Sequence, residues 1–576
     1  MSAGFDVIVV GAGAAGLVAA WHARQRGASV LVVNKGLVGR SGATITSGGG
    51  VSAAGSTLLA LGLPGDAADT EEVFLRDTLQ AGSWLNDQQL AAAMVSGVGP
   101  ELKRLIASGV KYHVTKKAPG HSSGRGIHIK GPEMQKAVTN QAVAAGAQFR
   151  EDFQSTELLR DADGVVVGIA GLDKRSGEAD AMFGRAVVLA TGGTTSNWHL
   201  RTAPEELSGE GHAMALAAGA ELIEMEMLQF LPCCLAAPAL WRGLQFPWTL
   251  GPQGGLRAWL LNRYGERFMA RWDPERMELA TRDVVSAACA AEVVEGRGSP
   301  NGAVYLSWAH LPKNIIDDYV TWSRSVTADW RWQGFDMSPL IERIREGYAV
   351  EVMPAAHFSL GGIRVDAQGA TRVPGLYACG EATGAVHGAN RLSGNAGAQM
   401  LAQGRAAGLA AARHAGRGRA TARAVNKDDA LAAIAAPLAA HGRDQALVPF
   451  ELKDSLTQLA ESALGAARSG PVLQQALETL RALRRDALPR LAPRNRERIW
   501  NRDWSDALEC RAAIPVLEAA LLGALGRTAS IGAHQRHDMR GHHAAGPLQH
   551  SLVAQDGDAL VLRHAAVAHT LMRAPC

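Results

Sequence analysis

A glycine-rich turn near the N-terminus constrains this chain more than any other feature. The run DVIVV at residues 6–10 is continuously apolar, as expected of a strand buried on both faces of a parallel sheet. It leads directly into GAGAAG at 11–16, which fits G-x-G-x-x-G, and then into a helix-like segment and a second apolar run, SVLVV. In such a β-α-β unit the glycines let the backbone approach a pyrophosphate and let the helix pack closely on the sheet. The predicted dinucleotide contacts are Gly11, Gly13, Ala14, Ala15 and Gly16.

The residues that follow the second strand help to distinguish FAD from NAD. Asn34 stands where an acidic residue often holds the ribose, and an asparagine can still form that hydrogen bond without charge. GRSGATITSGGG at 39–50 then replaces the helix that an NAD domain would normally have, and such small residues let N–H groups close on a flat ring. ATGG at 190–193 and GLYACGEA at 375–382 are further strand-to-glycine turns, and several such turns around one long ligand favour FAD. The predicted contacts are Asn34, Lys35, Ser41, Gly42, Ala43, Thr44, Gly48, Gly49, Ala190, Thr191, Gly192, Gly193 and Gly380.

Charge and cysteine content exclude several classes of function. The chain has 58 basic and 55 acidic residues, which gives no long-range reason to bind nucleic acid or an anionic membrane. Its six cysteines lack a C-x-x-C or ferredoxin-type spacing, so we expect no iron–sulfur cluster and no disulfide framework. No apolar run reaches the roughly 18 residues of a membrane span, and the first residues lack a secretory signal pattern. We therefore expect a cytoplasmic protein without a membrane span or a metal site.

The pattern along the chain changes twice. Strand-like segments at 164–173 and 184–193 extend the first unit, whereas 226–352 reads as loops and amphipathic segments without strand–helix alternation. A strand-like segment returns at 375–382, so the first domain is predicted to be interrupted by a second one. From about 427 the apolar residues recur at three- and four-residue steps, which indicates helices, and the last fifty residues look irregular.

Several blocks together resemble the flavoprotein subunit of the succinate dehydrogenase and fumarate reductase family, whose relatives include L-aspartate oxidase and the adenylylsulfate reductase flavoprotein. The most specific are LATRDVVS and HGANRLSGN, supported by HFSLGGIRVD, GRSGAT, NRYGERFMARWDP and IWNRDWSDALE. The resemblance covers almost the whole chain. It implies an α/β fold with a two-lobed FAD-binding Rossmann-like domain, an inserted capping domain and a C-terminal helical domain. The expected ranges are 1–228 and 353–415 for the FAD-binding domain, 229–352 for the capping domain, 427–545 for the helical domain and 546–576 for a C-terminal tail.

Redox chemistry at a C–C bond beside a carboxylate needs a hydride carrier, a group that moves a proton, and cations that hold the carboxylate. Arginine suits the last task because its planar fork pairs with a carboxylate. The resemblance implies that Arg282 transfers the proton and that His357 and Arg391 bind the substrate carboxylate. Arg282 beside Asp283 also fits a buried ion pair, and His357 also fits a hydrogen-bonded loop histidine. The further contacts that it implies are Glu381, Arg391, Ser393, Gly394 and Asn395 for the cofactor, and His121, Ser122 and Arg125 for the substrate.

Two departures from the family pattern change the expectation. The histidine that carries FAD covalently in the respiratory enzymes is replaced by Gly42, so we predict non-covalent FAD. The family's Gln-Phe-His-Pro-Thr, whose His and Thr help to hold a second carboxylate, is Gln229 to Cys233 here, with Leu231 and Cys233 in those places. Because leucine cannot donate a hydrogen bond and cysteine donates weakly, Leu231 and Cys233 predict an altered end of the substrate pocket.

The sequence thus predicts an FAD-dependent oxidoreductase acting on a C–C bond next to a carboxylate or similar group, with a substrate other than plain succinate or fumarate. Alternatives are a flavin oxidase of the L-aspartate oxidase type, an adenylylsulfate reductase-like flavoprotein subunit, and a non-catalytic FAD-bearing subunit. The expected partners are a small-molecule substrate carrying a carboxylate and, for electron exchange, a separate iron–sulfur electron-transfer subunit, a small carrier or oxygen, with no nucleic acid.

Overall fold

The computed structural model describes residues 4–115, 117–246, 256–318, 321, 331–332, 335–417, 424–539 and 546–574. Within these residues a seven-stranded sheet forms the centre of the FAD-binding domain, in the order β6-β2-β1-β9-β8-β7, with β18 also paired to β9. The strands are β1 Phe5–Val10, β2 Val30–Val33, β6 Gln148–Arg150, β7 Phe153–Arg160, β8 Val166–Asp173, β9 Glu178–Leu189 and β18 Leu376–Ala378.

The long strand β9 joins two kinds of pairing. Its second half runs parallel to both β1 and β18, whereas its first half pairs antiparallel with β8. Consequently the turn after β1, the turn after β9 and the turn after β18 all leave the same edge of the sheet, where a doubly wound sheet binds its ligand. The strands predicted around 164–173, 184–193 and 375–382 are confirmed.

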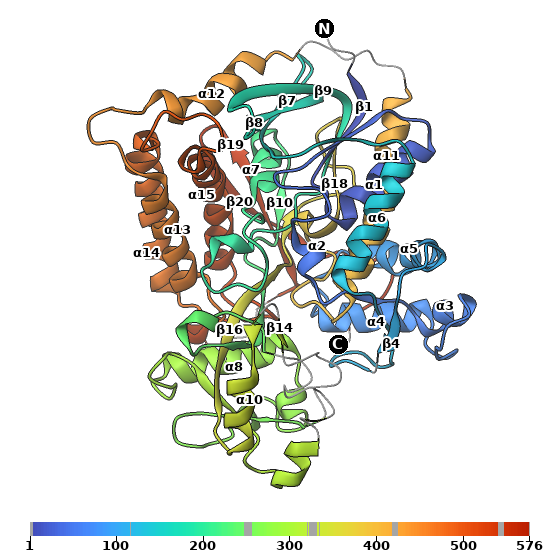
Figure 1. Cartoon of the computed structure of the whole chain (residues 1–576), viewed down its shortest axis with the longest axis vertical. Helices are drawn as coiled ribbons and strands as arrows, with labels where there is room; N and C mark the ends of the chain where they lie inside the picture. Colours follow the sequence, from blue (N-terminus) through green and yellow to red (C-terminus); the bar gives the residue numbers. More distant parts are fainter. Residues whose placement is uncertain are drawn as a thin grey trace.

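Helices cover this sheet, and small residues let two of them approach closely (Figure 1). A Cβ added at Gly404 would lie 2.5 Å from the Ala15 carbonyl oxygen, and one at Gly408 would lie 2.2 Å from that of Ala19. Glycine is therefore required where α11 crosses α1. The helices are α1 Ala14–Gln25, α4 Glu71–Ala81, α5 Gln88–Ala107, α6 Gly131–Ala144, α7 Glu210–Ala217 and α11 Asn395–Ala415. Short elements beside the site are α2 Ala43–Thr46, α3 Gly55–Ala60, β3 Gly50–Ser52, β4 His113–Thr115 and β5 Gly126–His128.

A capping domain with its own apolar core lies at the lower end of the molecule in Figure 1. Its sheet has the order β11-β16-β13-β12, so the segment contains strands where the sequence pattern predicted loops and amphipathic segments. The chain enters this domain along β11 and leaves it along β16, and these two strands pair with each other. The elements are β11 Leu228–Leu235, β12 Trp259–Leu261, β13 Val304–Ser307, β16 Val350–Ser359, α8 Arg282–Val294 and α10 Ser338–Arg345.

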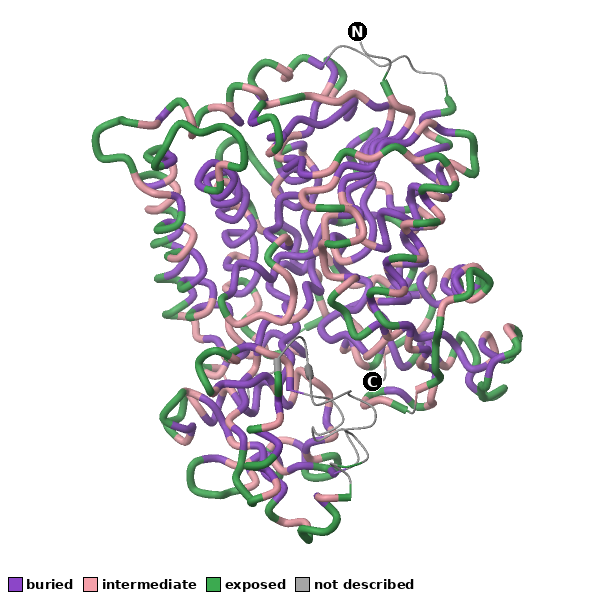
Figure 2. The backbone as a smooth tube through the Cα atoms, in the orientation of Figure 1, coloured by how far each residue is buried: buried purple, intermediate pink, exposed green. Residues whose placement is uncertain are grey.

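The C-terminal helices form a third unit beside the main sheet, drawn in orange and red in Figure 1. Their apolar faces are buried against one another and against the FAD-binding domain, whereas their outer faces are exposed (Figure 2). The helices are α12 Lys427–Ala439, α13 Pro449–Ala463, α14 Gly470–Ala482 and α15 Arg502–Gly526.

The end of the chain differs from the irregular tail predicted for 546–576. The strands β19 Gln549–Asp556 and β20 Ala559–Ala566 form a hairpin, and β19 pairs with β10 Leu222–Ile223 of the FAD-binding domain. The turn between them contains Gly557 at φ +57°, a left-handed conformation that favours glycine. The Asp-Gly pair between two apolar runs was the available signal for this hairpin. Among the described helices, none has the length and apolar character needed to cross a bilayer.

Candidate functional site

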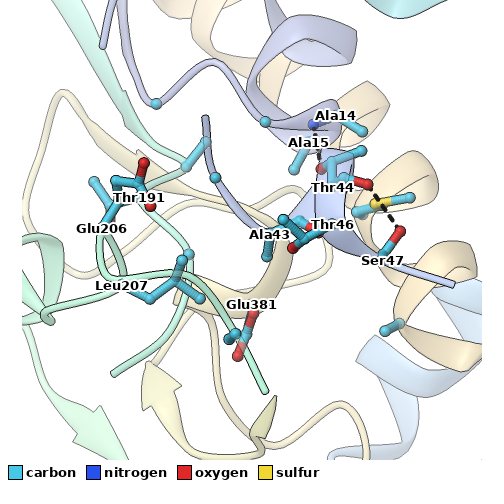
Figure 3. A pocket seen from close by; sticks show the side chains of 18 of the residues that line it. Ala14, Ala15, Ala43, Thr44, Thr46, Ser47, Thr191, Glu206, Leu207 and Glu381 are labelled. Atoms are coloured by element: carbon cyan, nitrogen blue, oxygen red, sulfur yellow. Dashed lines mark hydrogen bonds between the residues drawn. The ribbon is translucent and has the colours of Figure 1, made fainter. Parts of the chain in front are cut away.

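One large cavity lies at the edge of the main sheet where the glycine turns meet, with the capping domain on its far side. Figure 3 shows Ala14 and Thr44 along one part of its wall, Thr191, Glu206 and Leu207 along another, and Glu381 beside them. The cavity brings together the predicted residues Gly11, Gly13, Ala14, Ala15, Asn34, Lys35, Ser41, Gly42, Ala43, Thr44, Gly48, Gly49, Ala190, Thr191, Gly192, Arg282, His357, Glu381, Arg391, Ser393 and Gly394.

Four predicted cofactor contacts lie behind this lining. A Cβ added at Gly16 would lie 2.0 Å from the Gly11 carbonyl oxygen, and one at Gly193 would lie 2.4 Å from Oε1 of Glu381. A Cβ on Gly380 would lie 2.7 Å from that of Ala15. Because they lack a side chain, these three glycines let the segments that form the cavity wall pack closely against one another. The buried amide of Asn395 donates to Oγ1 of Thr78 at 3.0 Å.

The turn at the start of α1 is held by side chains that sequence reasoning assigned to the cofactor. Oγ1 of Thr44 accepts from the Ala14 N–H at 3.0 Å, a bond drawn in Figure 3. Asn34 accepts from the Ala12 N–H at 3.0 Å and uses both amide hydrogens, to Gly36 O and Ser41 Oγ at 2.9 Å. The structure therefore gives Asn34 a role in fixing the two loops that flank the nucleotide end of the cavity.

Lys35 connects the cavity wall to the helical domain through an ionic network. Its ammonium lies 2.8 Å from Oε1 of Glu210 and 2.7 Å from Oε1 of Glu509, and it donates to Ser208 Oγ at 2.9 Å. These contacts use all three of its hydrogens. Glu509 continues the network to Lys453 at 2.6 Å, and the two lysines hold the pKa of Glu509 at about 2 despite its burial.

The wall residues fit an FAD molecule on three observations. A Cβ added at Gly42 or Gly48 would meet nothing within 4 Å, so there is open space beside both glycines. Polar atoms of cavity-lining residues are buried without a partner in the described part of the chain: Oγ of Ser155, Oγ1 of Thr191 and Nε of Arg391. The first-turn N–H groups of α1 also face this edge of the sheet, where a helix N-terminus favours phosphate.

Glu381 is a buried carboxyl group at the centre of the wall. Its Oε1 accepts from the Ser359 N–H at 3.0 Å. Burial raises its pKa to about 7, although the Ser359 hydrogen bond and Arg391 act in the opposite direction. The side chain can therefore carry a proton near neutral pH and donate a hydrogen bond from it.

Arg282 is the first residue of α8 in the capping domain, and it reaches the cavity beside Gln229. Its NH1 group donates to Oε1 of Gln229 at 3.2 Å. The Gln229 amide donates to Asn390 Oδ1 and Arg391 O, both at 2.9 Å, which fixes its carbonyl toward Arg282. Sequence reasoning did not assign a role to Gln229, and its place beside two predicted catalytic residues is visible only in three dimensions.

The two arginines at this end of the cavity have no carboxylate partner among the described residues. Burial lowers the pKa of Arg282 to about 10, and burial together with Arg282 lowers that of Arg391 well below its ordinary value. The alternative of an ion pair between Arg282 and Asp283 is not seen, and Oδ1 of Asp283 is itself without a partner in the described residues. A buried guanidinium beside a half-buried one, both without a carboxylate partner in the described residues, is suited to bind an anion.

His357 lies on β16 between these arginines. Its Nδ1 is 2.7 Å from Oγ1 of Thr202, and its Nε2 has no hydrogen-bond partner in the described part of the chain. Burial, followed by the positive charges of Arg282 and Arg391, lowers its pKa well below the ordinary value. The imidazole is therefore neutral at pH 7, with one nitrogen available to a ligand.

The five predicted substrate contacts lie away from the lining. Leu231, on β11, packs with Leu200, Cys234 and Ala355. Cys233 packs against the core of the capping domain, where burial raises its pKa to about 12. Neither side chain lines the cavity, so the Leu and Cys of this segment do not form an apolar lining.

His121 and Arg125 are buried near the Ser393 loop, whereas Ser122 is exposed and bonds to Asp77, which also pairs with Arg125. Nε2 of His121 is 2.9 Å from the Ser393 carbonyl oxygen, and Arg125 is paired with Asp69 and Asp77. Arg125 is 1% exposed. This cluster supports the loop that lines the cavity.

Comparison with known proteins places this site in a family. Residues 6–396 match the model described as an FAD binding domain, and residues 453–575 match the one described as the fumarate reductase flavoprotein C-terminus. The chain is 32% identical to a fumarate reductase (CoM/CoB) subunit of Methanothermobacter marburgensis, over 92% of this chain and 94% of that protein. It is 33% identical to the L-aspartate oxidase of Streptomyces coelicolor, over 92% and 88%.

The chain also has the fold of solved structures. Sdh1 of Mycobacterium smegmatis, in complex with UQ1, has a TM-score of 0.84 and 30% identity, covering 98% of this chain and 94% of that chain. The adenylylsulfate reductase of Archaeoglobus fulgidus has a TM-score of 0.78 at 18% identity, covering 99% and 97%, and therefore shares the fold. With its FAD site and two arginines at one end of the cavity, the chain is an FAD-dependent oxidoreductase that belongs to the fumarate reductase and succinate dehydrogenase flavoprotein family.

Proposed function

We propose that this oxidoreductase acts on a C–C bond adjacent to a carboxylate, in a substrate other than plain succinate or fumarate. The observation that carries the proposal is the meeting of Arg282, Arg391 and His357 at one end of the cavity, with no carboxylate to neutralise the arginines in the described residues. A single substrate carboxylate would supply the missing charge.

FAD, when bound, supplies a hydride donor or acceptor. Arg391 and His357 hold the carboxylate, so the neighbouring carbon atoms are fixed relative to the capping domain. Arg282 delivers a proton to the α-carbon as the double bond is reduced, or accepts one in the opposite direction. Its pKa of about 10 brings it nearer to neutral than a solvated guanidinium, which favours proton exchange. The same positive charges stabilise the negative charge that develops on the carboxylate side of the substrate.

The replacement at Leu231 and Cys233 supports a substrate with one carboxylate. Leu231 is buried and Cys233 is partly buried, and neither lines the cavity, so neither offers a donor to a second carboxylate. A second carboxylate that entered the cavity and found no partner would cost several kcal/mol.

The proposal is tested by anaerobic reoxidation of the reduced holoenzyme with a panel of unsaturated acids. We expect a 2-enoate with one carboxylate to restore the yellow oxidised spectrum faster than fumarate does. Reoxidation by none of the acids, with the FAD still bound, would contradict the proposal.

Electron exchange is proposed to take place with a separate iron–sulfur protein, a small carrier or oxygen, because the chain has no cysteine spacing suited to a cluster. An oxidase of the L-aspartate oxidase type is the second candidate, favoured by the 33% identity to that enzyme. Hydrogen peroxide release from L-aspartate in air, without a partner protein, would favour the oxidase.

We also propose that FAD is held without a covalent bond, because Gly42 has no side chain that could attach to it. Precipitation of the holoenzyme with trichloroacetic acid should leave the yellow colour in the supernatant, measured by its absorption spectrum. Yellow colour that remains in the washed pellet would show that the cofactor is attached elsewhere.

A further inference from the structure

Thr202 lines the cavity beside His357 and makes the only hydrogen bond that the described residues give to that imidazole. We propose that Thr202 is a positioning residue: its hydroxyl holds His357 in the tautomer that presents an Nε2–H donor to the substrate carboxylate. This inference rests on the proposed function, in which His357 contacts that carboxylate.

The backbone fixes the two residues relative to each other. The Thr202 N–H donates to the Ala356 carbonyl at 3.0 Å, and the Ala356 N–H donates to the Leu200 carbonyl at 2.8 Å. Residues 200–202 thus run alongside β16 as a short parallel bridge. Because Ala356 immediately precedes His357, this bridge brings the Thr202 hydroxyl next to the ring.

The direction of the hydrogen bond follows from the available partners. Within the described part of the chain, the hydroxyl hydrogen of Thr202 has no acceptor other than Nδ1 of His357, 2.7 Å away. A threonine hydroxyl can donate one hydrogen, and a neutral imidazole has one donor and one acceptor nitrogen. If Nδ1 accepts from Thr202, the ring hydrogen must be on Nε2.

This tautomer is the one that suits an anion. With Arg282 and Arg391 nearby, the ring stays neutral, so its contribution is a directed N–H rather than a third positive charge. In the other tautomer the Nε2 lone pair would face the carboxylate and repel it. A residue that selects between the two states therefore controls binding without touching the reacting atoms.

The first test compares two substitutions at this position. Thr202→Val keeps the size and removes the hydroxyl, whereas Thr202→Ser keeps the hydroxyl and is the matched control. The probe is trans-2-butenoate, and its Kd is measured from the perturbation of the visible spectrum of the oxidised holoenzyme. Loss of one hydrogen bond should raise the Kd about tenfold in Thr202→Val, with unchanged FAD content, and Thr202→Ser should stay within about twofold. Wild-type affinity in Thr202→Val would overturn the proposal.

A double-mutant cycle separates an action through His357 from a direct contact with the ligand. In His357→Gln the amide can donate from a position near that of Nε2 without depending on a tautomer. If Thr202 acts through the ring, adding Thr202→Val to His357→Gln should change the Kd less than about twofold. Effects that multiply across the two sites would show that Thr202 does not act through His357.

The second readout needs neither turnover nor substrate. ¹⁵N NMR of histidine-labelled holoenzyme, with the His357 signals assigned by their loss in His357→Gln, should show an unprotonated Nδ1 and a protonated Nε2. In Thr202→Val the signals should shift toward the other tautomer. A protonated Nδ1 in the wild type would overturn the inference, whereas failure of every acid to bind or react would contradict the proposed function and leave this spectrum unchanged.

Discussion

Replacing Arg282 with alanine is expected to lower kcat by about 10²–10⁴-fold while FAD stays bound, because general acid–base catalysis contributes that much. Arg282 is on the capping domain and reaches the cavity, where its neighbour is the carbonyl of Gln229. The measurement is steady-state turnover alongside FAD content from the visible spectrum.

Arg276→Ala is the matched control for this change. Arg276 is also in the capping domain, but it pairs with Asp273 at 2.7 Å and its side chain is 57% exposed. Its removal should leave kcat within about twofold, because Arg276 does not line the cavity. Comparable turnover in Arg282→Ala and Arg276→Ala would remove Arg282 from the mechanism.

Replacing Lys35 with methionine is expected to lower the free energy of unfolding by ~3–5 kcal/mol, because it leaves the buried Glu210 carboxylate without a cation and removes one of the two cations that pair with Glu509. Lys35 binds Glu210 of the FAD-binding domain and Glu509 of the helical domain at the same time. The loss should therefore also loosen the contact between the two domains. Urea denaturation followed by circular dichroism measures the first effect, and limited proteolysis near α15 measures the second.

The control is Arg76→Met, which breaks a pair with Glu72 on the surface of α4. Both side chains are about half exposed or more, so this change should cost about 0–1 kcal/mol. If Lys35→Met costs no more than Arg76→Met, the buried network does not hold the helical domain in place.

Much of the fold could be predicted because local pattern and final structure agree. The apolar run before Gly11 forms β1. Gly11 and Gly16 of GAGAAG lie so close to the backbone of Ala190 and Gly11, respectively, that a side chain would not fit at either position. The hairpin at 549–566 was missed although its Asp-Gly turn is a local signal, because its first strand, β19, joins the sheet by pairing with β10, more than 300 residues earlier in the chain. No local property of those residues reports that partner.

The site was predicted less completely for a related reason. Sequence motifs identified residues near the cavity, but they could not separate those that line it from those that support the lining. Arg125 resembled a substrate contact and is in fact saturated by Asp69 and Asp77. Gln229 and Thr202 act through hydrogen bonds to residues more than 50 and 150 positions away, respectively. Such pairings depend on how β11, β16 and α8 pack together.

The central claim is that a carboxylate held by Arg391 and His357, beside the charge of Arg282, makes the adjacent C–C bond reactive. It is tested most directly by comparing trans-2-butenoate with trans-2-butenamide, which has the same carbon chain and no charge, in anaerobic stopped-flow reoxidation of the reduced holoenzyme. We predict reoxidation by the acid with formation of one equivalent of butanoate, and a rate at least about 100-fold lower with the amide, equivalent to the loss of roughly 2.7 kcal/mol of charge-dependent stabilisation. Equal rates with the two compounds, or no reoxidation by the acid, would contradict the claim.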